Sequence, residues 1–182
     1  KIYELADAKA SSLGDYLPNI LELEPDEKII HLVATDDYSG WLIFAFENGK
    51  VAKVELKSYA TKTNRKKLAN AYSDLSRPVR MLHITADLEL VAISSIDKVL
   101  IFDTANINPK TTRTTQGVQV MKGKKGSYLR EIKLLEEVAF QDLDYYRTKN
   151  IPAVGCYLRE EDQIQKQAAL LLDLEEPPQD LS

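Results

Sequence analysis

The sequence predicts an all-β protein built as an array of propeller-like blades. Three observations carry this prediction: a repeat about 48 residues apart, short alternating strands between turn residues, and a similar basic turn in each repeat. Repeats of about 40–50 residues made of a few short strands are typical of propellers. Partial copies begin near Lys1, Lys50 and Lys98, so we expect a partial array of about three blades. The two clearest copies are FENGKVAKVELKSYATKTNRKKLANAY (46–72) and KVLIFDTANINPKTTRTTQGVQVM (98–121).

The first forty residues are expected to contain strands and turns. Lys1–Lys9 alternates as a strand does, and Pro18 is expected to stop any helix within Ser11–Leu21. Glu24–Glu27 has the composition of a turn, and Lys28–Thr35 (KIIHLVAT) is an apolar, β-rich run. The chain opens in a strand-like stretch without a methionine, and we interpret it as a piece of a longer polypeptide.

The middle of the chain predicts two hairpins. Asn48-Gly49 is a strong two-residue turn signal between the expected strands Trp41–Glu47 and Lys50–Ser58. After a basic loop, residues 67–72 are expected to form a short strand or turn. The next strands, joined by Asp-containing turns, are Val79–Thr85, Glu89–Ser94 and Lys98–Asp103.

The C-terminal third changes in character. Tyr128–Val138 is compatible with a last strand pair or with a short helix. Arg159–Leu174 is rich in helix formers and predicts a helix, and the acidic Glu175–Ser182 that follows is expected to be disordered. The expected domain organisation is blades over 1–125, last strands or a connection over 126–157, and a helix with an acidic tail over 158–182.

Composition bounds the class of protein. A chain of 182 residues with 44% hydrophobic and 29% charged residues can form one large or two small soluble domains. The single cysteine, Cys156, excludes an intramolecular disulfide framework. No apolar run approaches the roughly 20 residues of a spanning helix, so we expect no membrane partner.

Charge is distributed unevenly along the chain. The net charge is −4, but residues 1–49 carry −7, residues 50–130 carry +10, and residues 131–182 carry −7. A basic centre between acidic ends indicates a polyanionic partner for the central part.

The basic residues of the centre recur in the repeated turns, interleaved with Thr, Asn and Gln. Lys and Arg together with hydroxyl and amide groups are what contact phosphate oxygens, so these turns predict a track for DNA phosphates. A solvated loop is the alternative reading of any single charge run. No helix-turn-helix or zinc-finger pattern occurs, so base-specific reading is not expected. The candidate DNA-binding residues are Lys50, Lys53, Lys57, Lys62, Arg65, Lys66, Lys67, Lys110, Arg113, Lys122, Lys124 and Lys125.

Signals of catalysis or metal binding are weak. His31 and His83 both fall within apolar strand runs, where a structural role is the simpler interpretation. No CxxC or HExxH motif occurs, and the segment Gly123–Gly126 lacks the pattern of a phosphate-binding P-loop. We therefore expect no catalytic residue, metal or cofactor in this chain.

The same residues resemble a known family. Gly49-Lys50-Val51 with Lys53, and Arg113 through Gly117-Val118, look like the strand entries in the C-terminal domain of the A subunit of bacterial type IIA DNA topoisomerases. This group comprises DNA gyrase and topoisomerase IV. The resemblance covers roughly residues 1–125 and is most specific in the copy that begins at Lys98.

The resemblance implies a β-pinwheel, in which neighbouring blades exchange strands and duplex DNA wraps around a basic perimeter. It implies a non-catalytic module of a bacterial cytoplasmic, nucleoid-associated enzyme, whose ATP and Mg sites lie in other domains. Its partners would be double-stranded DNA, the B subunit, and the rest of the A subunit. The glutamine-arginine-glycine-lysine box that gyrase uses for chiral wrapping is missing from this chain, which favours topoisomerase IV-like behaviour; a box upstream of Lys1 is the alternative.

Two other functions stay open at this stage. A protein-interaction propeller that does not bind DNA would have the same fold and would be indifferent to the basic turns. A small enzyme on this scaffold would need a pocket with perturbed titrating groups, for which the sequence gives no motif.

Overall fold

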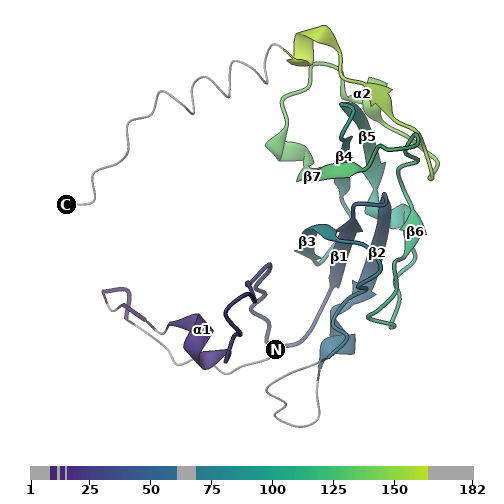
Figure 1. The fold of residues 1–182 in the computed structure, drawn as a ribbon. Coiled ribbons are helices and arrows are strands. Elements are labelled where there is room, and N and C mark those ends of the chain that lie inside the picture. Colours follow the sequence, from purple (N-terminus) through teal and green to yellow (C-terminus); the bar gives the residue numbers. More distant parts are fainter. Residues whose placement is uncertain (1–8, 12, 15, 61–68, 164–182) are drawn as a thin grey trace.

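Two four-stranded antiparallel sheets form the protein (Figure 1). The computed structural model describes residues 9–11, 13–14, 16–60 and 69–163. The first sheet has the order β3-β1-β2-β6 and the second β7-β4-β5-β8, which confirms the all-β prediction. The strands of the first sheet are β1 (Trp41–Phe46), β2 (Lys50–Glu55), β3 (Pro78–Ile84) and β6 (Val118–Gln119). Those of the second are β4 (Glu89–Ser94), β5 (Lys98–Asp103), β7 (Leu129–Leu134) and β8 (Cys156–Tyr157).

Helical segments in the described residues are short. Each second strand of a hairpin ends in a single 3-10 turn, which turns the chain out of the sheet. The helical segments are α1 (Leu17–Ile20), η1 (Leu56–Tyr59), η2 (Thr104–Asn106), η3 (Leu135–Glu137) and α2 (Leu143–Tyr146).

Each sheet is built on a hairpin that the sequence predicted. β1 pairs with β2 and β4 pairs with β5, both antiparallel. Asn48-Gly49 joins the first pair, and Gly49 has φ +78°, which a residue without Cβ adopts at little cost. The expected strands Glu89–Ser94 and Lys98–Asp103 are confirmed at both ends.

The sheets exchange strands. β3 precedes β4 along the chain, yet it pairs with β1 in the first sheet. β6 follows the second hairpin, yet it returns to pair with β2. β7 and β8 occupy the corresponding places beside β4 and β5. Neither sheet can therefore form from one contiguous stretch, and the two sheets fold as one interdependent unit.

The main core lies between the sheets. Ile43 and Val51 of the first sheet pack there with Leu90, Leu100 and Phe102 of the second, all at most 2% exposed. Because successive strand residues point to opposite faces, alternate residues of the same strands form two further clusters on the outer faces. The cluster outside the first sheet contains Phe44, Phe46, Val54, Leu56 and Tyr59. The cluster outside the second sheet contains Val91, Val99, Ile101 and Tyr146.

Two glycines allow the edge strands to approach the hairpins. Gly117 before β6 has φ +72°, and a Cβ added to it would lie 2.0 Å from the main-chain oxygen of Val51. Gly155 before β8 has φ +74°, and its added Cβ would lie 2.7 Å from the oxygen of Val99. Val51 and Val99 hold the same place in their hairpins, so the repeat extends to the edge strands.

The N-terminal region differs from the sequence prediction. Lys28–Thr35 is not part of a strand, and the described residues form two sheets where about three blades were expected. The helix α1 contains Pro18, so the expectation that this proline excludes a helix is wrong. Pro18 lies in the first turn, where its missing N–H has no intrahelical partner to lose. Residues 1–8 of the expected first strand lie outside the described residues.

In the C-terminal region, the structure decides between the two predictions for Tyr128–Val138. Tyr128–Val138 contains one strand, β7, followed by η3, and is neither a strand pair nor an α-helix. Residues 160–163 are helical, as the pattern of Arg159–Leu174 predicts. The rest of that helix and the acidic tail lie outside the described residues.

Candidate nucleic-acid interface

The segment 110–125 follows the outer edge of the first sheet as far as Met121, and its last residues then lead past the end of the β1–β2 hairpin toward β7. We call residues 110–125 the outer-edge segment. Its main chain is tied to β2 near the start, where the N–H of Lys110 donates to the oxygen of Lys53 at 2.8 Å. The N–H of Glu55 donates back to the oxygen of Lys110 at 2.9 Å. Further on, β6 pairs with the beginning of β2. Figure 1 shows β6 on the outer margin of the two sheets, opposite β3 and β7.

Exposed lysines accumulate along this edge. None of them forms an ion pair with another described residue, so no carboxylate of the described residues is paired with their ammonium groups. Arginines elsewhere are matched by acids: Arg80 with Glu137, Arg130 with Asp97, Arg147 with Glu89 and Arg159 with Asp142. The exposed lysines of the outer-edge segment are Lys110, Lys122, Lys124 and Lys125, and Lys57 of η1 is also exposed.

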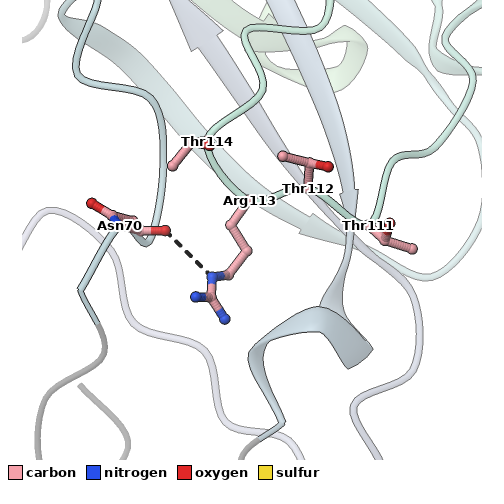
Figure 2. A pocket seen from close by; sticks show the side chains of 5 residues that line it. All are labelled: Asn70, Thr111, Thr112, Arg113 and Thr114. Atoms are coloured by element: carbon pink, nitrogen blue, oxygen red, sulfur yellow. Dashed lines mark hydrogen bonds between the residues drawn. The ribbon is translucent and has the colours of Figure 1, made fainter.

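Arg113 lies in a shallow hollow of about 320 Å³ that Asn70 and Thr111–Thr114 line (Figure 2). Its Nε donates to the main-chain oxygen of Asn70 at 3.3 Å, and its Nη1 donates to that of Ser58 at 3.1 Å. The guanidinium carbon lies 5.9 Å from the centre of the Tyr59 ring. Two of its nitrogens thus bond to the main chain of η1 and of Asn70, and three threonines line the hollow.

Tyr59 belongs to the same arrangement. Its hydroxyl donates to the main-chain oxygen of Ala71 at 2.6 Å, and its ring is 9% exposed. Burial raises the pKa of this phenol, and the charge of Arg113 acts in the opposite direction. The hydroxyl therefore stays protonated in neutral solution and serves as a fixed donor.

Lys50 lies at the same edge but is partly covered. Its ammonium is 3.4 Å from Oε1 of Gln116, and Gln116 also accepts from the Asn48 side chain. Since an ammonium has three N–H donors, this contact leaves capacity for an external acceptor.

Lys53 does not lie on the exposed surface, so its assignment to a DNA-contacting edge is wrong. Only 3% of the residue is exposed, and its Nζ is 2.5 Å from Oδ1 of Asp87 and 4.3 Å from the centre of the Trp41 ring. Val51, Lys53 and Glu55 alternate along β2, so Lys53 points to the same face as Val51, toward the second sheet. It carries charge into the space between the sheets.

Four of the predicted basic residues fall in the first basic loop. They lie outside the described residues, so the structure does not place them: Lys62, Arg65, Lys66 and Lys67.

Sequence reasoning missed a counterpart on the second sheet. The segment from Arg147 to β8 follows the outer edge of β5 and begins with a 2.9 Å bond from the Thr148 N–H to the Ile101 oxygen. Lys149 is exposed there, whereas Arg147 is held by Glu89 and Asp144. In the sequence, Gly117 and Gly155 each stand one residue before an edge strand. This shared position of the two glycines is the signal that could have revealed the repeat.

Two kinds of site are absent from the described residues. No group of three His, Cys, Asp or Glu side chains among them could hold a metal ion. Within the same residues, no helix has the length and apolarity to cross a membrane.

Comparison with known proteins agrees with this architecture. No family model matches the chain. The A subunit of DNA gyrase from Mycobacterium bovis (strain BCG / Pasteur 1173P2) is 26% identical over 126 residues, covering 67% of this chain and 15% of the relative. The crystal structure of the C-terminal domain of DNA topoisomerase IV matches with a TM-score of 0.60 and 28% identity. That match covers 72% of this chain and 42% of the solved one.

A second solved structure, of the DNA gyrase A C-terminal domain, matches with a TM-score of 0.56 and 16% identity over 81% of this chain and 55% of that one. These matches confirm the resemblance drawn from the strand-entry residues, and the chain has the β-pinwheel fold of those C-terminal domains. It spans 15% of the length of the curated relative.

Proposed function

We propose that this chain is a non-catalytic DNA-binding module of the A subunit of a bacterial type IIA topoisomerase. One observation carries the proposal: exposed lysines without a carboxylate partner among the described residues accumulate along the outer-edge segment, in a chain whose net charge is −4. Similarity to the C-terminal domain of topoisomerase IV and to a gyrase A subunit supports the choice of a DNA polyanion.

Binding through this edge would be electrostatic. Each Lys or Arg that neutralises a phosphate releases counterions, so the logarithm of affinity falls with that of salt by about 0.9 per contact. The lysines are long and strongly hydrated and contact phosphate as point charges, which gives no base reading. The module would therefore bind duplex DNA of any sequence, with micromolar affinity expected at physiological salt.

The strand topology suggests why a curved duplex would fit. The segments beside β2 and β5 repeat in space, so Thr148 corresponds to Lys110, and the exposed Lys149 follows Thr148 directly. Bending DNA along successive sheets costs on the order of several kcal/mol, which the added phosphate contacts must offset. In the full enzyme, DNA cleavage, ATP and Mg would belong to other domains and to the B subunit.

The glutamine-arginine-glycine-lysine box does not occur in this sequence, and a box ahead of Lys1 would lie outside it, so gyrase and topoisomerase IV both stay candidates for the parent enzyme. With the box, the resemblance implies chiral wrapping of DNA; without it, the module would wrap DNA without that handedness. Relaxation and supercoiling assays of the whole enzyme, with and without residues 41–157, would distinguish these two activities.

Fluorescence anisotropy with a labelled 30-base-pair duplex at 50 and 200 mM salt tests DNA binding directly. The doubly reversed variant Lys124→Glu/Lys125→Glu should weaken binding at least about tenfold and reduce the salt slope by about 2. The matched control, Lys28→Glu/Lys133→Glu, changes net charge equally at residues away from the outer edge. Equal weakening by both variants would mean that only net charge matters and would contradict the proposed interface.

The alternative, a protein-interaction propeller that does not bind DNA, predicts no anisotropy change at 50 mM salt. A second variant covers the first basic loop: Arg65, Lys66 and Lys67 are changed to Glu, and Arg113 is kept because it bonds to the main chain of Ser58 and Asn70. We expect it to abolish binding. Circular dichroism of each variant should be unchanged, since the test requires folded protein.

A further inference from the structure

The outer edges of the two sheets match in geometry. β6 and β8 are the edge strands, and each begins one residue after a glycine with positive φ, Gly117 or Gly155. Each edge strand also pairs with the beginning of the second hairpin strand, β2 or β5. Three positions of the first edge therefore correspond to three of the second: Gln116 to Val154, Gln119 to Tyr157, and Lys50 to Lys98.

At the edge of the first sheet, the two glutamines bond to neighbouring residues of the same edge. Oε1 of Gln116 accepts from Nζ of Lys50 at 3.4 Å and from the Asn48 side chain at 3.3 Å. Nε2 of Gln119 donates to the main-chain oxygens of Asn48 and Met121, at 2.8 and 2.7 Å. Both side chains are thus polar, and both are held by the edge itself.

At the edge of the second sheet, apolar side chains take these two places and stay exposed. Val154 is 45% and Tyr157 is 54% exposed, and we call these two residues the aromatic edge. The ammonium of Lys98 lies 4.7 Å from the centre of the Tyr157 ring. Because water solvates apolar surface poorly, covering the aromatic edge with a partner of suitable shape is favourable.

The aromatic edge continues the outer-edge segment in space. The N–H of Lys122 donates to the main-chain oxygen of Ala153 at 2.8 Å, and the Ala153 N–H donates to the oxygen of Val120 at 2.9 Å. Val154 follows directly on this bonded residue. Lys122 is therefore a main-chain neighbour of one end of the aromatic edge, and Lys98 pairs with the other end. Neither lysine forms an ion pair with a carboxylate of the described residues.

Duplex DNA has the chemistry that fits this arrangement. Along each DNA strand, anionic phosphates alternate with apolar deoxyribose rings, so every nucleotide offers a partner for a lysine and one for an aromatic ring. A protein partner would need a carboxylate beside each of the two lysines as well as an apolar group between them. The cations at both ends of the aromatic edge therefore favour a nucleic-acid strand over a protein surface.

We propose that the aromatic edge packs against the deoxyribose rings of duplex DNA, while Lys98 and Lys122 contact the flanking phosphates. This inference rests on the proposed function and adds to it a contact that is not electrostatic. Counterion release counts only the neutralised phosphates, so an apolar contact strengthens binding equally at low and at high salt. The two sheets thus bind DNA in different ways, the first by charge alone and the second by charge and apolar contact.

Fluorescence anisotropy with the same 30-base-pair duplex at 50 and 200 mM salt tests the proposal. The variant Val154→Gln/Tyr157→Gln gives the second edge the residues of the first at both positions and leaves the net charge unchanged. It should weaken binding about tenfold at each salt concentration and leave the salt slope unchanged. Tyr157→Phe keeps the ring and should bind within about twofold of the unmodified chain.

A matched control removes two exposed apolar residues elsewhere. Leu13 and Tyr16 are 107% and 69% exposed and lie next to α1, away from the second sheet (Figure 1). Leu13→Gln/Tyr16→Gln should bind DNA within about twofold of the unmodified chain. Circular dichroism and thermal melts check that each variant is folded. If the double glutamine variant does not fold, Tyr157→Gln alone makes the same test, since the first edge has glutamine at that position.

Several results would contradict a DNA contact by the aromatic edge while leaving the proposed function intact. One is a double glutamine variant that binds as the unmodified chain does, when Lys124→Glu/Lys125→Glu weakens binding. A salt slope reduced by about 1 or more would mean that the variant has lost phosphate contacts. Equal weakening by Tyr157→Phe would assign the contact to the hydroxyl, and equal weakening by the control would show that the position is unimportant.

Two further results separate the remaining possibilities. An unmodified chain that gives no anisotropy change at 50 mM salt would end the proposed function and this inference together. Sedimentation tests for a different occupant: dimers of the unmodified chain that the double glutamine variant loses, with DNA affinity unchanged, would assign the aromatic edge to a second copy of the chain.

Discussion

The ammonium of Lys53 lies 2.5 Å from Oδ1 of Asp87 and joins the first sheet to the turn that leads into the second. Thr104 donates its hydroxyl to the same carboxylate oxygen at 2.7 Å, and its main-chain oxygen lies 3.4 Å from the Lys53 Nζ. The bond from Lys53 holds the pKa of Asp87 below its usual range. A lysine that resembles a DNA contact in sequence therefore fastens two neighbouring sheets.

Loss of the Asp87 charge should destabilise the protein more than loss of both charges. Asp87→Asn keeps an acceptor for Thr104 but leaves the Lys53 ammonium buried without a counter-charge, which should cost about 3 kcal/mol. Lys53→Met with Asp87→Asn removes both charges and should cost less. Urea unfolding of the singles and the double measures the coupling.

DNA affinity of the folded Lys53→Met variant should match that of the unmodified chain, measured by anisotropy. A tenfold loss of affinity would mean that Lys53 does contact DNA, as the sequence predicted.

The ion pair between Arg80 and Glu137 should make stability depend on acid pH. Nη1 of Arg80 is 2.6 Å from Oε2 of Glu137, and this bond lowers the pKa of Glu137 to about 2. A carboxyl whose pKa is lowered on folding stabilises above its unfolded pKa, near 4.5, and loses that contribution as pH falls toward 2. Because both groups are partly exposed, the contribution is about 1 kcal/mol.

Glu137→Gln should therefore lower Tm by about 2–4 °C at pH 7, and the difference should shrink between pH 4.5 and pH 2. Thermal melts of both proteins across this range measure it. A difference that stays constant with pH would contradict the ion pair as its cause.

Gly117→Ala should be costly because of a close approach as well as its backbone angle. The added Cβ would lie 2.0 Å from the Val51 oxygen, so β6 would have to move from β2. Gly126 also has positive φ, +84°, but nothing lies within 4 Å of its added Cβ. Gly126→Ala should cost about 1 kcal/mol, and Gly117→Ala at least about 2 kcal/mol more. Equal costs in urea unfolding would mean that β6 yields freely.

Tyr146→Phe should destabilise the packing of residues 135–162 against the outer face of the second sheet. The Tyr146 hydroxyl donates to Oδ2 of Asp162, 3% exposed, and accepts from the N–H of Arg159 at 2.9 Å. Its removal leaves two buried groups short of a partner, which should cost about 2–3 kcal/mol. Burial raises the pKa of Tyr146 to about 12, so the phenol is neutral in the native protein.

Amide exchange should quicken over residues 135–162 in this variant and stay unchanged in β1 and β2. Uniformly faster exchange over the whole protein would show that residues 135–162 do not unfold separately from the sheets.

The sequence determined the features that depend on neighbouring residues. Alternation of apolar residues and the Asn48-Gly49 turn predicted the two hairpins, with Glu89–Ser94 and Lys98–Asp103 correct at both ends. Turn chemistry and strand alternation act over a few residues, so they can be read directly from the chain. Of the predicted basic turns, only the second lies within the described residues, and its Lys110, Lys122, Lys124 and Lys125 are exposed; the repeat of basic turns stays a prediction.

Only the tertiary structure decided which strands share a sheet and which charges are buried. β6 pairs with β2 across more than sixty residues, and Lys53 meets Asp87 across 34. The strand-like run Lys28–Thr35 forms no strand, since main-chain hydrogen bonding needs a neighbour that local pattern does not supply. Composition and alternation state what a segment can do, and pairing and burial depend on which distant segment packs beside it.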